Sequence, residues 1–97
     1  MAETGVRLTP RRRFGQLSQK PATVEIDGVP VGHARWDRPE FFATGPGRHR
    51  LTVSFPYLWK KRICEATIEV DIPAEQTIDA EYRVAGLVRG TGSLTIP

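Results

Sequence analysis

The spacing of apolar residues restricts this chain of 97 residues to β-structure. No helix-length window keeps apolar side chains at the i, i+3, i+4 and i+7 positions that form one face of a helix. Eight prolines and nine glycines, spread through the sequence, would also interrupt helices. Apolar and polar residues instead alternate at every second position, as they do in strands with one buried face.

Three segments show this alternation most clearly, at residues 50–59, 63–72 and 77–84. In the first, the odd-numbered residues from Leu51 to Trp59 form the expected buried face, and even-numbered residues such as Thr52 and Ser54 are expected to face water. In the second and third segments, the even-numbered residues form the expected buried face.

Shorter segments and turn residues complete the predicted set of strands. Asp27-Gly28, between segments 22–26 and 29–34, is a strong signal for a two-residue hairpin turn. Gly45-Pro46-Gly47 predicts a tight corner after a strand at 41–44. Further short strands are expected at 87–89 and 93–96, and weaker candidates lie at 6–8 and 14–17.

Seven to nine short strands with turns between them predict an all-β fold. The expected architecture is an antiparallel β-sandwich, with a small barrel as the alternative. A chain of this length forms one domain, because independent domains mostly contain about 50 to 250 residues. We expect a basic N-terminal arm over residues 1–20, containing the early candidate strand, and a sandwich domain over residues 21–97.

The order of strands and turns from Ala22 to Arg83 resembles a known family. It is carried by the runs VEIDGVPVGHA, FFATGPGRHRLTV and ATIEVDIPAEQTIDAEYR. This order resembles the PEGA-type small β-sandwich modules of bacterial proteins, and more loosely the transthyretin-like and carboxypeptidase-regulatory-like sandwiches. The match departs from that pattern at residues 55–62, where an aromatic and basic segment replaces a shorter polar turn. The resemblance implies a binding or scaffolding module with no catalytic residues to carry over.

The sequence offers little for catalysis or for binding a metal or cofactor. The single cysteine, Cys64, excludes an intramolecular disulfide and a cysteine-based metal site, and its place in the alternation predicts a buried, inert thiol. A metal site would need both histidines, His33 and His49, together with a carboxylate. We expect His49 to pack or hydrogen-bond at its turn instead. We therefore predict no catalytic residue, no metal, no cofactor and no small-molecule substrate.

Acidic residues occupy the expected exposed faces of segments 63–72 and 77–84. A catalytic pair of carboxylates would have to be desolvated, with pKa values driven apart. The alternation instead predicts a solvated face whose acids pair across strands with Arg48, Arg50 or Arg83. The acids concerned are Glu65, Glu69, Asp71, Asp79 and Glu81.

Two basic clusters stand out in a chain with a net charge of +3 and an isoelectric point near 9.5. One is Arg11-Arg12-Arg13 in the N-terminal arm, and the other is Tyr57-Leu58-Trp59-Lys60-Lys61-Arg62, at the expected tip between the two longest strands. Aromatic side chains beside cations can stack on bases while the cations neutralise phosphates, or they can lie on an anionic membrane surface. Alternatively, the cations protect edge strands and keep the tip soluble.

Aromatic residues outside the tip are too numerous for a thin core, so we expect Trp36, Phe41 and Phe42 to be exposed with it. Trp and Arg are frequent at interface hot spots. The sequence therefore predicts a non-enzymatic module that binds another protein or itself, with Trp59 as the anchor. Nucleic-acid binding through Arg11–Arg13 and Lys60–Arg62 is the alternative, and contact with a membrane surface ranks third.

The predicted location is the cytoplasm. The N-terminal residues contain neither the apolar core nor the cleavage site of a signal peptide, and no apolar run is long enough to span a membrane as a helix. Small secreted domains usually depend on disulfides, which a chain with one cysteine cannot form within itself.

Overall fold

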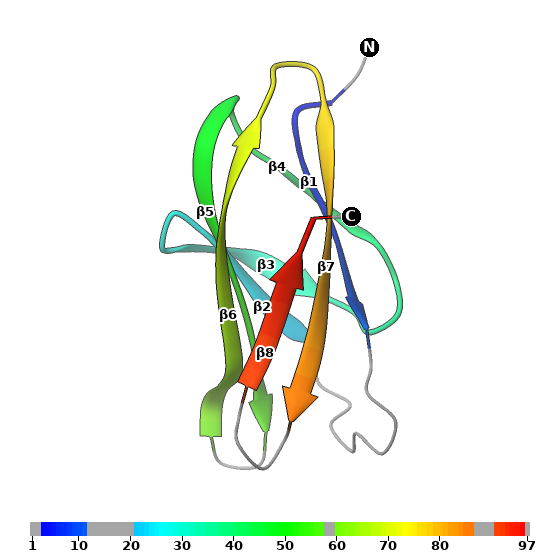
Figure 1. The fold of residues 1–97 in the computed structure, drawn as a ribbon, viewed down its shortest axis with the longest axis vertical. Coiled ribbons are helices and arrows are strands. Elements are labelled where there is room, and N and C mark those ends of the chain that lie inside the picture. The colour runs from blue at the N-terminus through cyan, green and yellow to red at the C-terminus, as the bar shows by residue number, and fades with distance from the viewer. Residues whose placement is uncertain (1–2, 12–20, 58–59, 87–90, 97) are drawn as a thin grey trace.

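Two four-stranded β-sheets pack face to face in the computed structural model, which describes residues 3–11, 21–57, 60–86 and 91–96 (Figure 1). The predicted all-β sandwich is confirmed. The strands of the described residues are β1 (Gly5–Arg11), β2 (Ala22–Ile26), β3 (Val29–Ala34), β4 (Glu40–Ala43), β5 (Gly47–Tyr57), β6 (Lys60–Ile72), β7 (Thr77–Gly86) and β8 (Thr91–Thr95).

The strand order is β4-β1-β7-β8 in one sheet, called sheet A here, and β3-β2-β5-β6 in the other, called sheet B. Neighbouring strands are antiparallel except β1 and β7, which pair in parallel from Gly5 opposite Thr77 to Arg11 opposite Arg83. β1 is thus an inner strand of sheet A, and Val6 and Leu8 on it are fully buried. The sandwich therefore includes Gly5–Arg11, which lie within the predicted N-terminal arm at residues 1–20.

The β2–β3 hairpin forms at the predicted Asp27-Gly28 turn. Asp27 has a φ angle of 54° and Gly28 one of 80°, the paired positive values of a type I′ turn. The Asp27 N–H donates a hydrogen bond of 2.8 Å to the Arg50 carbonyl, which ties the turn to β5.

The core lies between the sheets and consists of the inward residues of the strands. The predicted even-numbered pattern holds in the described parts of β6 and β7, with Val70, Ile72, Ala80 and Tyr82 buried. The remaining buried apolar residues are Val6, Leu8, Ala22, Val24, Ile26, Ala34, Trp36, Phe42, Leu51 and Val53.

The outward face of β5 is more buried than predicted, since Thr52 and Ser54 are both buried. β5 is an inner strand of sheet B, and Thr52 lies between Glu25 on β2 and Thr67 on β6. Its hydroxyl is 3.0 Å from the Thr67 hydroxyl. Short side chains at the centre of a sheet are covered by their neighbours on both sides, so the expectation that they face water was wrong.

The last strand, β8, overlaps the predicted segment at 93–96 and pairs with the long strand β7, for example Leu94 opposite Tyr82. Residues 87–90 and the weaker candidate strand at 14–17 lie outside the described residues.

Glycine is required at position 5 by the close approach of β4 to β1. A Cβ atom at Gly5 would overlap the Phe42 carbonyl oxygen and would lie 2.8 Å from Phe41 Cζ. A larger residue must therefore displace β4 or the Phe41 ring.

We predict that Gly5→Ala lowers the free energy of unfolding by about 1–3 kcal/mol, as overpacking usually does. Gly45→Ala is the control, because a Cβ atom at Gly45 would meet nothing within 4 Å. Its effect should stay within about 0.5 kcal/mol. Urea unfolding followed by circular dichroism measures both, and equal midpoints for the two variants would contradict the prediction.

Candidate functional site

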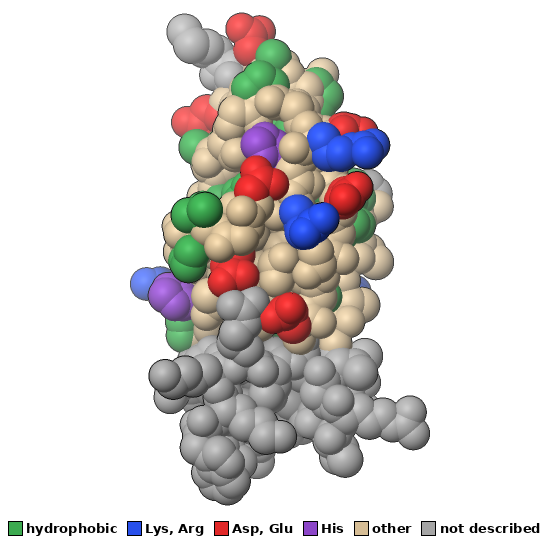
Figure 2. Space-filling model, turned by 90° about the vertical axis from the view of Figure 1, so that its left-hand side faces the viewer, with side chains coloured by type: hydrophobic (Ala, Val, Ile, Leu, Met, Phe, Trp, Pro, Cys, Tyr) green, Lys and Arg blue, Asp and Glu red, His purple; other side chains and the backbone are tan. Residues whose placement is uncertain are grey.

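A shallow hollow of about 630 Å³ lies on the outer face of sheet B. Figure 2 shows this face, on which histidine, acidic and basic side chains lie close together. The lining residues come from β2, its following turn, β5 and β6: Glu25, Asp27, Gly28, Arg48, His49, Arg50, Thr52, Glu65, Thr67 and Glu69.

At one end of the hollow, His49 is held between two oxygen atoms. Its Nδ1 atom lies 2.6 Å from Asp27 Oδ2, and its Nε2 atom lies 2.7 Å from the carbonyl oxygen of Gly45. The other carboxylate oxygen of Asp27 accepts a hydrogen bond of 2.8 Å from the Arg50 N–H. The expectation that His49 hydrogen-bonds at its turn is confirmed.

These contacts shift the pKa values of both groups. The hydrogen bond that His49 donates to Asp27 is the largest cause that raises the pKa of His49, and the bond to the Gly45 carbonyl is the next. The hydrogen bond from His49, followed by that from the Arg50 N–H, lowers the pKa of Asp27. Both shifts favour the charged pair of imidazolium and carboxylate.

Arginines of β5 pair with acids of β6 across the rest of this face. Arg48 Nε lies 3.3 Å from Asp71 Oδ1, and this hydrogen bond is the main cause that raises the pKa of Arg48. Glu69 lies 3.8 Å from both Arg48 and Arg50. The predicted pairing of acids with arginines across strands is confirmed here.

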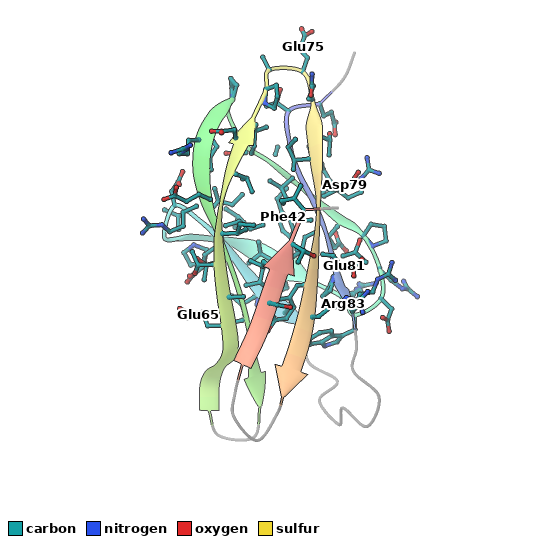
Figure 3. All side chains as sticks on the ribbon, in the orientation of Figure 1. Phe42, Glu65, Glu75, Asp79, Glu81 and Arg83 are labelled. Atoms are coloured by element: carbon teal, nitrogen blue, oxygen red, sulfur yellow. The ribbon has the colours of Figure 1, made fainter. Side chains whose placement is uncertain are left out.

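Ion pairs also lie on the outer face of sheet A. Arg7 on β1 lies 3.5 Å from Asp79 on β7, a pair across strands, whereas Arg83 pairs with Glu81 within β7. Figure 3 shows Asp79, Glu81 and Arg83 projecting from β7 away from sheet B. Exposed ion pairs of this kind add little to stability.

The hydrogen bonds of His49 limit the chemistry of the hollow. Both ring nitrogens of His49 already have partners, so the ring has no free position from which to act as a base. Among the described residues, no group of three or more His, Cys, Asp or Glu side chains could hold a metal ion. The side chain of Cys64 lies outside the described part of the structure.

The predicted aromatic and basic tip is where β5 passes into β6. Tyr57 is the last residue of β5 and pairs with Lys60, the first residue of β6. Leu58 and Trp59 lie outside the described residues, as do the side chains from Phe55 to Cys64. A partner-binding role for Tyr57–Arg62 therefore stays a prediction.

Trp36 is buried, which corrects its prediction as an exposed contact residue. Only 7% of its surface is exposed, and its ring centroid lies 6.1 Å from that of Tyr82. The Asp37 N–H donates a hydrogen bond of 2.6 Å to the Pro10 carbonyl at the end of β1. This bond fixes the β3–β4 connection against sheet A, so Trp36 turns inward.

Phe42 is also buried, whereas its neighbour Phe41 is partly exposed. Phe42 pairs with the inward residue Val6, and its ring fits beside Gly32, where a Cβ atom would lie only 3.2 Å from Phe42 Cε1. Figure 3 shows Phe42 between the sheets. Phe41 faces outward opposite Arg7, so of the three aromatics it alone remains a candidate for partner contact.

The N-terminal basic cluster is only partly visible. Arg11 is the last residue of β1, and its Nε atom lies 3.6 Å from Glu81 Oε2. Arg12 and Arg13 lie outside the described residues.

Comparisons with protein-family models, with curated proteins and with solved structures found no match to this chain. Within the described residues, no helix is long and apolar enough to cross a membrane.

Trp36→Ala should lower the free energy of unfolding by about 3–5 kcal/mol, because it removes a large buried ring. Phe41→Ala is the matched control, since that ring is partly exposed on the outer face, and its effect should be clearly smaller. Chemical unfolding followed by circular dichroism avoids the signal of the second tryptophan. If Phe41→Ala destabilised the protein as much as Trp36→Ala, the assignment of Trp36 to the core would be wrong.

Proposed function

We propose that this chain is a non-enzymatic protein-interaction module, a small scaffold that binds an acidic partner protein or a second copy of itself. The contact surface is one end of the sandwich, which we call the basic end. It is defined by Arg11 as the last residue of β1 and by Lys60–Arg62 as the first residues of β6.

The arrangement of the strands supports this choice of surface. β5 and β7 end at the basic end, β6 and β8 begin there, and β1 runs parallel to β7 toward this end (Figure 1). Arg11 and Lys60–Arg62, which are far apart in the sequence, thus lie toward the same end of the molecule. Trp59 follows Tyr57 of β5 by two positions and is the aromatic anchor that the sequence suggests.

The separation of charge along the chain is the observation that carries the proposal. Eight of the 14 Lys and Arg residues fall in three stretches without any Asp or Glu: three in residues 12–24, three in 54–64 and two in 82–97. These stretches include the ends of β5 and β7 and the starts of β2, β6 and β8, whereas Arg11, at the end of β1, lies just before the first of them. All 11 acidic residues lie elsewhere in the sequence. A concentration of positive charge attracts and orients an acidic partner.

The proposed setting is the cytoplasm, as the single cysteine suggests. We also retain the resemblance to PEGA-like modules as part of this proposal, because a compact sandwich of two four-stranded sheets is compatible with it. The resemblance supports scaffolding over catalysis.

Removal of the charges at the basic end should abolish partner binding. The test variant is Lys60→Gln/Lys61→Gln/Arg62→Gln, and the control is Arg7→Gln/Arg48→Gln/Arg50→Gln, which removes the same charge from the faces of the two sheets. Affinity capture from a nuclease-treated bacterial lysate, with mass spectrometry, compares their partners, and sedimentation velocity compares their self-association.

We expect the affinity for partner proteins, or for a second copy, to fall about tenfold or more in the test variant, a loss of about 1.4 kcal/mol. Wild type and control should retain their affinity. If all three proteins captured the same partners in the same amounts, the basic end would not be the contact surface.

Nucleic-acid binding is the second candidate, favoured by the position of both Arg11 and Lys60–Arg62 toward one end of the sandwich. Its test is fluorescence anisotropy of a labelled mixed-sequence oligonucleotide at low and at physiological salt. Binding that weakens steeply with salt and is lost in the Lys60/Lys61/Arg62 variant would establish phosphate contacts and replace the protein-partner proposal. Absence of binding at low salt would remove this candidate.

A further inference from the structure

The hydrogen bonds of His49 specify its protonation state. Its two ring nitrogens face a carboxylate oxygen of Asp27 at 2.6 Å and the carbonyl oxygen of Gly45 at 2.7 Å. A carbonyl oxygen and an ionised carboxylate only accept hydrogen bonds, whereas a neutral imidazole has a single N–H to donate. Only the doubly protonated imidazolium can donate to both oxygens at once.

The two oxygens belong to different parts of the fold. Asp27 lies in the β2–β3 turn of sheet B, and Gly45 lies in the connection that carries the chain from β4 in sheet A to β5 in sheet B. The ring of His49, near the start of β5, therefore links the turn to the crossover between the sheets. The ring is largely covered, with 18% of its side chain exposed.

Asp27 is the charged group that faces His49 among the described residues of the surrounding elements. On β5, the neighbouring Arg48 and Arg50 point to β6, where they pair with Asp71 and Glu69. The β4–β5 connection, Thr44–Gly47, contains no titratable side chain. The protonation of this ring thus depends chiefly on one carboxylate and one carbonyl.

We propose that Asp27, His49 and Gly45 form a proton-operated latch that fixes the β4–β5 connection to the β2–β3 turn and releases the connection when His49 loses a proton. The ionised Asp27 favours a proton on Nδ1, so the proton that leaves to solvent comes from Nε2. The Nε2 lone pair then faces the Gly45 oxygen, which removes that hydrogen bond while the bond to Asp27 persists.

The latch is closed in a defined range of pH. The pKa of His49 is raised by its partners, so the stabilisation is complete below the ordinary histidine value of about 6.5 and is lost as pH rises through the raised pKa. The pKa of Asp27 is lowered, so its contribution is present above the ordinary carboxyl value and is lost as pH falls through the lowered pKa. Mildly acidic solution, below about pH 6.5 and above the ordinary carboxyl value, therefore keeps the latch closed.

The test is nitrogen NMR of the imidazole rings across a pH titration of the full chain. The reference is the ordinary histidine pKa of about 6.5. We expect His49 to titrate above this value, to keep its proton on Nδ1 in the neutral form, and to shift the Gly45 and Gly47 amide signals with the same midpoint. If His49 titrated at or below the ordinary value, or if the neutral ring kept its proton on Nε2, the latch would be refuted.

Asp27→Asn removes the charge of the carboxylate but keeps the turn, because Asn also tolerates positive φ angles. We expect the midpoint of His49 to fall toward the ordinary histidine value of about 6.5 in this variant. Asp71→Asn is the control, since it removes an acid of the same face that pairs with Arg48 and not with His49. An unchanged His49 midpoint in Asp27→Asn, or an equal fall in Asp71→Asn, would overturn the proposal.

Discussion

The apolar layer between the two sheets is the interaction on which the other features of the molecule depend. Inward residues of β1, β2, β5, β6 and β7 meet there, together with Trp36 and Phe42 from outside those strands. In a strand, the neighbours of an inward residue must point outward. The burial of Leu8 and Ala80 thus places Arg7 and Asp79 on the outer face of sheet A, where they pair. The charged faces are a consequence of the core, and their ion pairs add little stability of their own.

Features that depend on neighbouring residues could be predicted from the sequence. The Asp27-Gly28 turn needs only two residues that accept positive φ angles, and the buried pattern of β6 and β7 needs only alternation. Trp36 and Phe42 could not be placed in this way. Their burial depends on the bond from Asp37 to Pro10 and on the space beside Gly32, which arise only when distant segments meet.

The hydrogen bonds around His49 also could not be predicted from local sequence patterns. The sequence indicated a hydrogen-bonding histidine at a turn, but its partner Asp27 is 22 residues away. The two meet because β2 and β5 pair with Ile26 opposite Leu51, so the residue after β2 reaches the start of β5. Given that register, the pair could have been inferred, since an acidic turn residue next to a histidine on the adjoining strand forms a favourable charged contact. The register itself depends on the whole sheet.

The latch and the basic end lie at opposite ends of β5, which begins at Gly47 and ends at Tyr57. The eight steps from His49 to Tyr57 span roughly 26 Å at about 3.3 Å per residue. Charges at the surface are largely screened beyond about 8 Å at physiological salt. Titration of His49 therefore has no appreciable direct electrostatic effect on a partner at Lys60–Arg62. Any pH dependence of binding that disappears in a His49 variant would have to be transmitted through the structure of sheet B, where β5 and its partner β6 both run between the two sites.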